Sequence, residues 1–272
     1  MTSLVSWVGI DQRLPSSIYI ASDSRISWQD KSAWDYGRKT FACSRSPDVF
    51  GYCGDVLFPS QALGQLVSLI DDGLILSNEM DYETRMEAVF KYLGTSLEQY
   101  PIAWRQIFSI IYGTRSSSGM SSKFHAVKFH WDKNWSRDEL MIPNRSDLLI
   151  ALGSGASAVA AAFDEWNRGD ASGTSRAVFS AFCDALSTGN DPSSGGPPQL
   201  VGLYREYAGM TFGVISGAGA YYNGSAVAAS GDLSKVEWRN ALFERCDGAT
   251  LKRLEGAQPQ PRPRSQEVVD YR

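Results

Sequence analysis

The chain has 272 residues, of which 43% are hydrophobic and 21% charged, and its formal net charge is −4. This length allows one large domain or two small ones with a sizeable core. A net negative charge does not indicate the basic surface of nucleic-acid-binding proteins. No apolar run approaches the roughly 20 residues that cross a bilayer. We therefore expect a globular protein with neither a nucleic-acid nor a membrane partner.

Cysteine and histidine usage restricts the chemistry. The four cysteines (Cys43, Cys53, Cys183 and Cys246) are widely scattered and show neither paired metal-ligand spacing nor a disulfide framework. The N-terminus lacks the order of regions that defines a signal peptide. Only two histidines occur, which disfavours a Ser-His-Asp triad or a multi-histidine metal site. We expect a cytoplasmic protein without a metal or another cofactor.

The first half of the chain predicts two hairpins followed by two helices. β-Branched and apolar runs separated by short polar loops that contain proline are typical of antiparallel hairpins. Apolar side chains then recur at helical spacing. The predicted hairpin strands are 3–10 with 18–23 and 37–43 with 49–54, and the predicted helices are 59–73 and 83–100.

The second half of the chain again predicts strands followed by two helices, and then further strands. The predicted strands are 106–112, 124–131, 139–142, 148–152, 200–204 and 211–215, with a further piece near Tyr221, and the predicted helices are 156–166 and 175–187. Such an order indicates an α+β fold in which two sheets pack on each other with helices outside. We expect a single domain over 2–254. The Pro-, Gln- and Arg-rich segment 255–272 lacks apolar periodicity and is predicted to be disordered.

A threonine stands directly behind the initiator methionine. Methionine is normally removed when the next residue is small, so we expect the mature chain to begin at Thr2 without a propeptide. A terminal threonine combines a hydroxyl nucleophile with a free amine whose ordinary pKa is about 7.7–8. Taken alone, Thr2 is better explained as the first residue of an ordinary strand.

Six short motifs follow one another along the chain. They are Thr2-Ser3-Leu4, Ala21-Ser22-Asp23-Ser24-Arg25, Arg38-Lys39, Gly51-Tyr52-Cys53-Gly54, Gly153-Ser154-Gly155 and Asp191-Pro192-Ser193-Ser194-Gly195-Gly196. Each is weak alone, but in this order and spacing the series resembles the β-type subunits of the proteasome and their simpler bacterial relatives. These proteins are N-terminal-nucleophile hydrolases. The resemblance spans roughly residues 2–204.

The resemblance implies a four-layer αββα sandwich and a threonine-type endopeptidase that forms an acyl-enzyme on Thr2. Lys39 would lie beside Thr2 and pair with Asp23. The base that activates the hydroxyl would be the terminal amine, acting through a water, or the lysine; the sequence leaves both open. The polar residues implied around the amine are Ser154, Asp191 and Ser194, and the implied oxyanion-hole donor is the Gly54 backbone N–H.

The same resemblance implies further partners and a substrate pocket. Ile26, Tyr52 and Val56 would lie near the substrate side chain and favour an uncharged one. The substrate would be a peptide or unfolded protein, the assembly a homo-oligomeric ring, and an ATP-dependent unfoldase could supply substrate. Asp55 follows Gly54 where the family often has a small residue, so its carboxylate would either oppose the oxyanion or point into a helix start.

Other interpretations stay open at this stage. Asp23 could simply end a strand, Gly54 could be a turn glycine, and serines and Asp-Pro pairs in loops are usually caps or turn openers. On the same scaffold, the chain could be an amidase of a small molecule. It could also be a non-catalytic structural subunit, although such subunits usually lack the terminal threonine.

Overall fold

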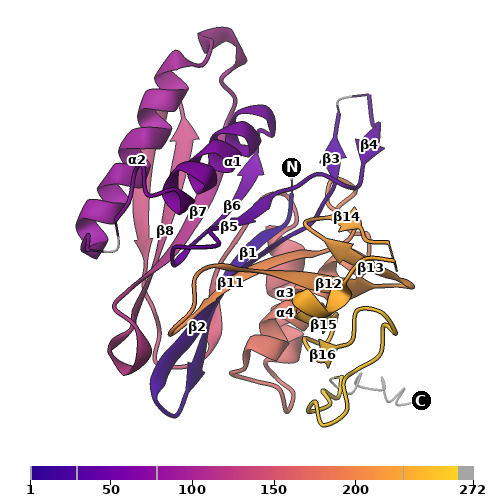
Figure 1. Cartoon of the computed structure of the whole chain (residues 1–272). Coiled ribbons are helices and arrows are strands. Elements are labelled where there is room, and N and C mark those ends of the chain that lie inside the picture. Colours follow the sequence, from indigo (N-terminus) through magenta and orange to yellow (C-terminus); the bar gives the residue numbers. More distant parts are fainter. Residues whose placement is uncertain (1, 29, 78, 229, 263–272) are drawn as a thin grey trace.

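The computed structural model describes residues 2–262 apart from 29, 78 and 229. Within these residues the chain is a mixed α/β protein with two large sheets and four α-helices (Figure 1). A separate two-stranded hairpin, β3 (Ile26–Ser27) and β4 (Ala33–Trp34), projects from the body and was not predicted. No helix in the described part of the chain is long and apolar enough to cross a bilayer.

The larger sheet contains the N-terminal strand as the second strand from one edge. Its continuous order is β10 (Asp147–Leu152), β1 (Leu4–Asp11), β2 (Leu14–Ser22), β11 (Gln199–Tyr204), β12 (Met210–Ser216), β13 (Gly219–Tyr222) and β14 (Ser225–Ala226). β1 and β2 form the predicted antiparallel hairpin, with Val5 opposite Ala21. Two short strands that were not predicted extend this sheet: β15 (Trp238–Asn240) runs parallel to β12, and β16 (Arg245–Cys246) pairs with β15.

The second sheet has five strands in the order β5 (Thr40–Ala42), β6 (Asp48–Gly54), β7 (Phe108–Ser116), β8 (Lys123–Asp132) and β9 (Asn134–Leu140). The strand predicted at 139–142 is corrected here: β9 begins five residues earlier and ends at Leu140. Most of its side chains are exposed at the sheet edge, so the sequence carries no alternation of buried and exposed residues.

Four helices cover the sheets. They are α1 (Leu57–Asp71), α2 (Tyr82–Gln99), α3 (Ala156–Trp166) and α4 (Ser175–Ser187). Side chains at the N-cap start two of them: Asp81 accepts a hydrogen bond from Thr84 N at 2.8 Å, and Thr174 accepts one from Ala177 N at 3.3 Å. Short 3₁₀ helices lie at Ile102–Trp104, Gly119–Ser121 and Leu233–Lys235.

Three apolar clusters hold these elements together. One joins α1 and α2 to the five-stranded sheet, as Leu66 and Val89 meet Phe50 and Phe129. A second joins α3 and α4 to the larger sheet, and a third contains Leu4 and Ile111 from the facing sides of the two sheets. Each fully buried aliphatic side chain contributes roughly 1.5–3 kcal/mol.

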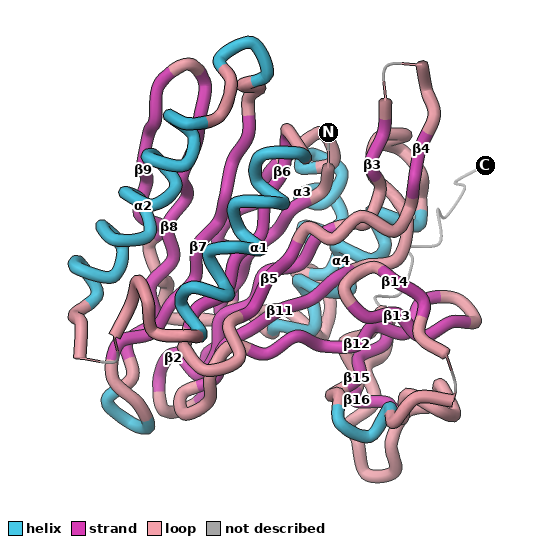
Figure 2. The backbone as a smooth tube through the Cα atoms, turned by 45° about the horizontal axis from the view of Figure 1, so that its top comes forward, coloured by secondary structure: helices cyan, strands magenta, loops and turns pink. Residues whose placement is uncertain are grey.

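The sheets bring distant polar segments together. The start of β1 and the end of β2 lie at the same end of the sheet because these strands are antiparallel. The start of β5 lies near this end of the sheet. Figure 2 shows the N-terminus close to β6, the strand that pairs with β5. Thr2, Asp23 and Lys39 flank these strand ends, so the fold places them within reach of one another.

Candidate active site

The Gly153-Ser154-Gly155 turn holds the backbone of Thr2 at the start of β1, at one end of the larger sheet. Thr2 is almost fully buried, with 1% of its surface exposed, and its carbonyl accepts a hydrogen bond from Gly155 N at 3.4 Å. Gly153 has φ +87°, and a Cβ at this position would lie 1.9 Å from the Thr2 carbonyl oxygen. Only glycine permits this backbone conformation and close approach together.

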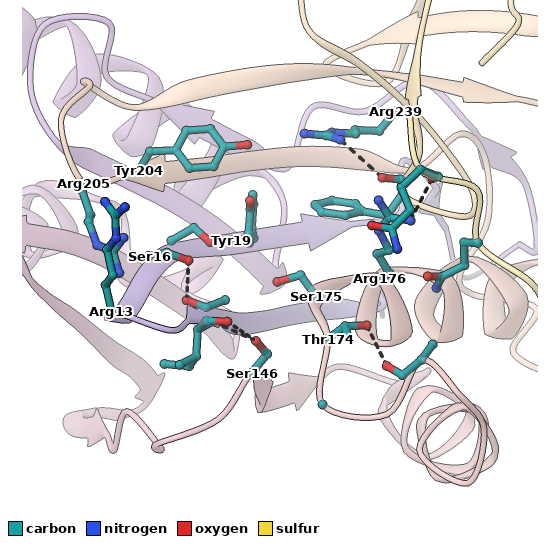
Figure 3. Close-up of a pocket in the computed structure, with 18 of the residues that line it drawn as sticks. Arg13, Ser16, Tyr19, Ser146, Thr174, Ser175, Arg176, Tyr204, Arg205 and Arg239 are labelled. Carbon is teal, nitrogen blue, oxygen red and sulfur yellow. Dashed lines mark hydrogen bonds between the residues drawn. The ribbon is translucent and has the colours of Figure 1, made fainter. Parts of the chain in front are cut away.

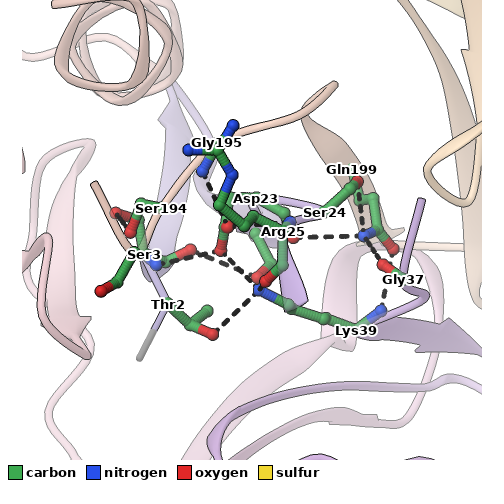
Figure 4. A network of polar contacts seen from close by, with 12 residues as sticks. Thr2, Ser3, Asp23, Ser24, Arg25, Gly37, Lys39, Ser194, Gly195 and Gln199 are labelled. Atoms are coloured by element: carbon green, nitrogen blue, oxygen red, sulfur yellow. Dashed lines mark hydrogen bonds and ion pairs between the residues drawn. The ribbon is translucent and has the colours of Figure 1, made fainter. Parts of the chain in front are cut away.

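The Thr2 hydroxyl contacts a buried ion pair (Figure 4). Lys39 Nζ donates hydrogen bonds to Thr2 Oγ1 at 2.9 Å, to Asp23 Oδ1 at 2.9 Å and to the Arg25 carbonyl at 2.6 Å. The side chains of Lys39 and Asp23 are 0% exposed. An ammonium group has three N–H donors, and here all three have acceptors. The charged form of Lys39 is therefore fully hydrogen-bonded despite its burial.

Asp23 is the acceptor that organises the surrounding backbone. Its Oδ1 also accepts from Ser3 N at 3.0 Å, and its Oδ2 accepts from Arg25 N at 3.1 Å and Gly195 N at 3.0 Å. Ser3 and Gly195 lie 20 and 172 residues from Asp23 in the sequence, so one carboxylate fixes the relative positions of distant segments. Burial lowers the pKa of Lys39, and the charge of Asp23 opposes this effect.

A second polar chain reaches the backbone nitrogen of Thr2. Thr2 N donates to Ser154 Oγ at 3.2 Å, and Ser154 Oγ donates to Asp191 Oδ2 at 2.6 Å. Ser194 Oγ donates to the same carboxylate oxygen at 2.7 Å and accepts from Ser3 Oγ at 2.9 Å. Burial acts to raise the pKa of Asp191, but hydrogen bonds from Ser154, Ser194 and the Ser193 N–H lower it overall.

Gly54 lies at the end of β6, on the sheet that carries Lys39. Its φ is +98°, and a Cβ there would lie 2.5 Å from the Ile107 carbonyl oxygen. Two residues earlier, Tyr52 N donates to the Lys39 carbonyl at 3.1 Å, which ties this strand to the lysine. Asp55 Oδ2 accepts from Phe58 N at 3.3 Å, so its carboxylate points into the start of α1. The oxyanion role of Gly54 stays a prediction.

The three residues predicted near a substrate side chain line one pocket. Ile26, Tyr52 and Val56 contribute to a pocket of about 740 Å³, which is within the usual range for small-molecule sites. Arg38 also lines it, with its guanidinium 4.2 Å from the centre of the Phe41 ring. The lining therefore includes a cation, and the preference for an uncharged side chain stays a prediction.

Sequence reasoning missed Gln199, which is 1% exposed at the start of β11. Its Oε1 accepts from Lys39 N at 3.0 Å, while its Nε2 lies 2.7 Å from the Gly37 carbonyl and 3.2 Å from the Asp23 carbonyl. The Arg25–Asp35 ion pair, with an N–O distance of 2.7 Å, was also missed. For Gln199, the sequence offered one signal: a glutamine opens an apolar strand directly after Pro197-Pro198.

Comparison with protein-family profiles finds no match, and comparison with curated protein sequences finds no similar sequence. Among solved structures, the chain is similar to eukaryotic HslV from Trypanosoma brucei, with 13% sequence identity and a TM-score of 0.49. The similarity covers 74% of this chain and 99% of that chain. At this level of similarity, the case for the chemistry of the site rests on its geometry alone.

Proposed function

We propose that the chain is a threonine-type N-terminal-nucleophile peptidase whose nucleophile is Thr2 Oγ1 after removal of Met1. The observation that carries this proposal is the 2.9 Å contact between Lys39 Nζ and Thr2 Oγ1 within a fully buried Lys39–Asp23 pair. A buried ion pair is costly to desolvate and seldom adds stability by itself, so its position against a terminal hydroxyl supports a chemical use.

In the proposed reaction, the free amine of Thr2 accepts the hydroxyl proton, directly or through a water. Oγ1 forms a bond to the carbonyl carbon of the substrate, and the resulting tetrahedral intermediate expels the amine product, which takes up that proton. Water then hydrolyses the Thr2 ester and regenerates the hydroxyl. The contact from Thr2 N to Ser154, and from Ser154 to Asp191, supports the amine as the group that is held in place.

Lys39 is assigned an electrostatic role. Its three N–H donors are all accepted in the resting site, which favours the ammonium form over a free base. A positive charge 2.9 Å from Oγ1 stabilises negative charge that develops on this oxygen. The Gly54 N–H is assigned to the carbonyl oxygen of the intermediate, and losing such a donor typically costs about 10²–10³ in rate.

The proposal includes the four-layer αββα arrangement and an assembly. The three apolar clusters between successive helical and sheet elements support the layers. Ile102, Trp104 and Ile107 are 78%, 68% and 56% exposed close to the end of β6, and exposed apolar groups of this kind favour burial against another subunit. A homo-oligomeric ring in the cytoplasm, unfolded-protein substrates and an unfoldase partner are proposed on the resemblance alone.

The test uses the parent chain, Thr2→Ala and Thr2→Ser with a panel of fluorogenic peptides and small amides. Thr2→Ser keeps a hydroxyl and should retain turnover, whereas Thr2→Ala should abolish it while leaving the fold intact. Intact mass must show that Met1 is absent from the active material, because a retained methionine leaves the Thr2 nitrogen in a peptide bond. Peptide turnover by a folded Thr2→Ala chain contradicts the mechanism. Hydrolysis of small amides alone would identify an amidase instead.

A further inference from the structure

A second cavity lies at the far end of β1 and β2 from Thr2 (Figure 3). Its volume is about 980 Å³, and its lining includes Gly9 and Ser16 near the β1–β2 turn, the start of α4, and residues 258–261. Gly9 is seven residues beyond Thr2 along an extended strand, which corresponds to a separation of roughly 20 Å. The cavity is therefore separate from the candidate active site.

Four arginines line this cavity: Arg13, Arg176, Arg205, which is paired with Asp11 at 2.7 Å, and Arg239. Arg176, in the first turn of α4, donates to the Gln258 carbonyl at 2.9 Å and forms no ion pair with another described residue. Arg239, from β15, pairs with Glu237 and donates to the Phe243 carbonyl at 3.4 Å. Burial lowers the pKa of Arg176, while the nearby charge of Glu244 opposes this effect and that of Arg239 adds to it. The guanidinium groups of Arg176 and Arg239 thus reach one cavity, and of the two only Arg239 has an ion-pair partner among the described residues.

The same wall carries two buried donors that lack acceptors. Arg239 is 9% exposed, and its Nε has no hydrogen-bond partner among the described residues. Gln260 is 8% exposed, and its Nε2 is likewise without a partner in the described part of the chain. Both residues line the cavity. Trp7 Nε1 and Arg85 Nε also lack partners among the described residues, but Arg239 and Gln260 differ from them in lining one cavity, where an added acceptor can satisfy both donors.

The N-terminus of α4 also favours a negatively charged acceptor in this cavity. The first N–H groups of a helix have no acceptor within the helix, and its dipole places partial positive charge there. Thr174, Ser175 and Arg176 open this 13-residue helix and all line the cavity. A Cβ on Gly9 would lie 2.9 Å from Ser175 Oγ, so glycine allows this hydroxyl to approach β1.

We propose that this cavity binds a small organic oxyanion, a phosphate monoester or an aromatic carboxylate, whose charged group accepts hydrogen bonds from Arg176, Arg239 and Gln260. Tyr19, Tyr204 and Phe243 also line the cavity and supply aromatic surface for the organic part. Asp170 and Glu206 are present in the lining as well. The four arginines of the lining outnumber these two carboxylates, and within the lining Arg176, Arg239 and Gln260 are assigned to hold the anion.

Isothermal titration calorimetry of the full chain tests this site with phenyl phosphate, benzoate and neutral benzamide. Saturable one-to-one binding is expected for at least one of the two anions and none for benzamide. The anion that binds more tightly shows whether the cavity prefers a phosphate or a carboxylate group. Arg176→Gln should weaken this binding by about tenfold or more, because a charge-assisted contact is lost. Arg45→Gln, which removes an exposed arginine paired with Asp72 elsewhere on the surface, should leave the affinity unchanged.

Gln260→Leu provides a second variant that keeps every charge and removes one unpartnered donor. It should weaken anion binding by at least about threefold while the circular dichroism spectrum stays that of the parent. The proposal is overturned if neither anion saturates the chain below about 10 mM, or if the folded variants bind as tightly as the parent. All titrations can use the Thr2→Ala background, so failure here is separate from failure of the proposed peptidase.

Discussion

Replacing Asp23 by asparagine removes one charge of the buried pair and keeps nearly the same shape. Asp23 accepts four hydrogen bonds, from Lys39 Nζ and the N–H groups of Ser3, Arg25 and Gly195. Each carboxylate oxygen accepts two of these hydrogen bonds and the asparagine NH₂ group cannot accept, so two donors lose their partner and Lys39 is left as an uncompensated buried cation. Breaking a buried pair in this way costs about 3–5 kcal/mol, a large part of a typical stability of about 5–15 kcal/mol.

Guanidinium denaturation of the inactive Thr2→Ala chain, with and without Asp23→Asn, measures this loss through the midpoint at constant slope. The matched control is Asp72→Asn, whose ion pair with Arg45 has an N–O distance of 3.4 Å and whose side chain is 64% exposed. This control should change stability by less than about 0.5 kcal/mol. A loss below about 1 kcal/mol for Asp23→Asn would refute the assignment of a tightly coupled, buried pair.

Three further predictions concern the polar surroundings and the pH response. Gly153→Ala should displace Thr2 and abolish hydrolysis, whereas Gly173→Ala, with φ +69° and nothing within 4 Å of its Cβ, should cost only the backbone penalty of about 1–2 kcal/mol and leave turnover intact. Ser154→Ala should lower kcat roughly 10–100-fold with a small change in KM, since a hydrogen bond to the reacting amine is lost, while the exposed Ser172→Ala should not; equal kinetics for the two variants would contradict the Ser154 assignment. A hydrogen bond from Arg205 lowers the pKa of Asp11 from 3.8 to about 2, so this pair stabilises the fold above pH 3.8 and loses its contribution as the pH falls through about 2. Asp11→Asn should therefore be less stable than the parent at pH 6, and this deficit should shrink as the pH falls from about 4 toward about 2, as measured by urea denaturation; a deficit that persists unchanged at pH 2 would count against this pair.

The regular elements of the fold could be predicted where one face is buried. The helices expected at 156–166 and 175–187 have these bounds in the structure, because their apolar spacing is strong and Thr174 caps the second. β9 could not be placed by alternation since it lies at a sheet edge with mostly exposed side chains. β15 and β16 contain three and two residues, too few to form any period, and their pairing depends on tertiary contacts.

The candidate site could be predicted in part, because its residues are polar groups next to strand ends and glycine turns. Thr2, Asp23 and Lys39 lie in one hydrogen-bonded cluster, and Ser154, Asp191 and Ser194 form the chain that reaches the Thr2 nitrogen. Gln199 was missed since a single glutamine carries no motif, and its partners lie 160 to 176 residues away in the sequence. Residues 258–260 lie against Arg176 and Glu244 through contacts that their composition does not encode, while 263–272 lie outside the described residues.

The central claim is that a free Thr2 supplies both the nucleophile and its base. Labelling of the purified chain with a β-lactone or epoxyketone reagent, followed by peptide mapping, tests it most directly. The account predicts one equivalent of label on Thr2 in chains that lack Met1, and none in Thr2→Ala. A folded chain that begins at Thr2 but stays unlabelled, or that carries the label on another nucleophile such as Cys53, would contradict it.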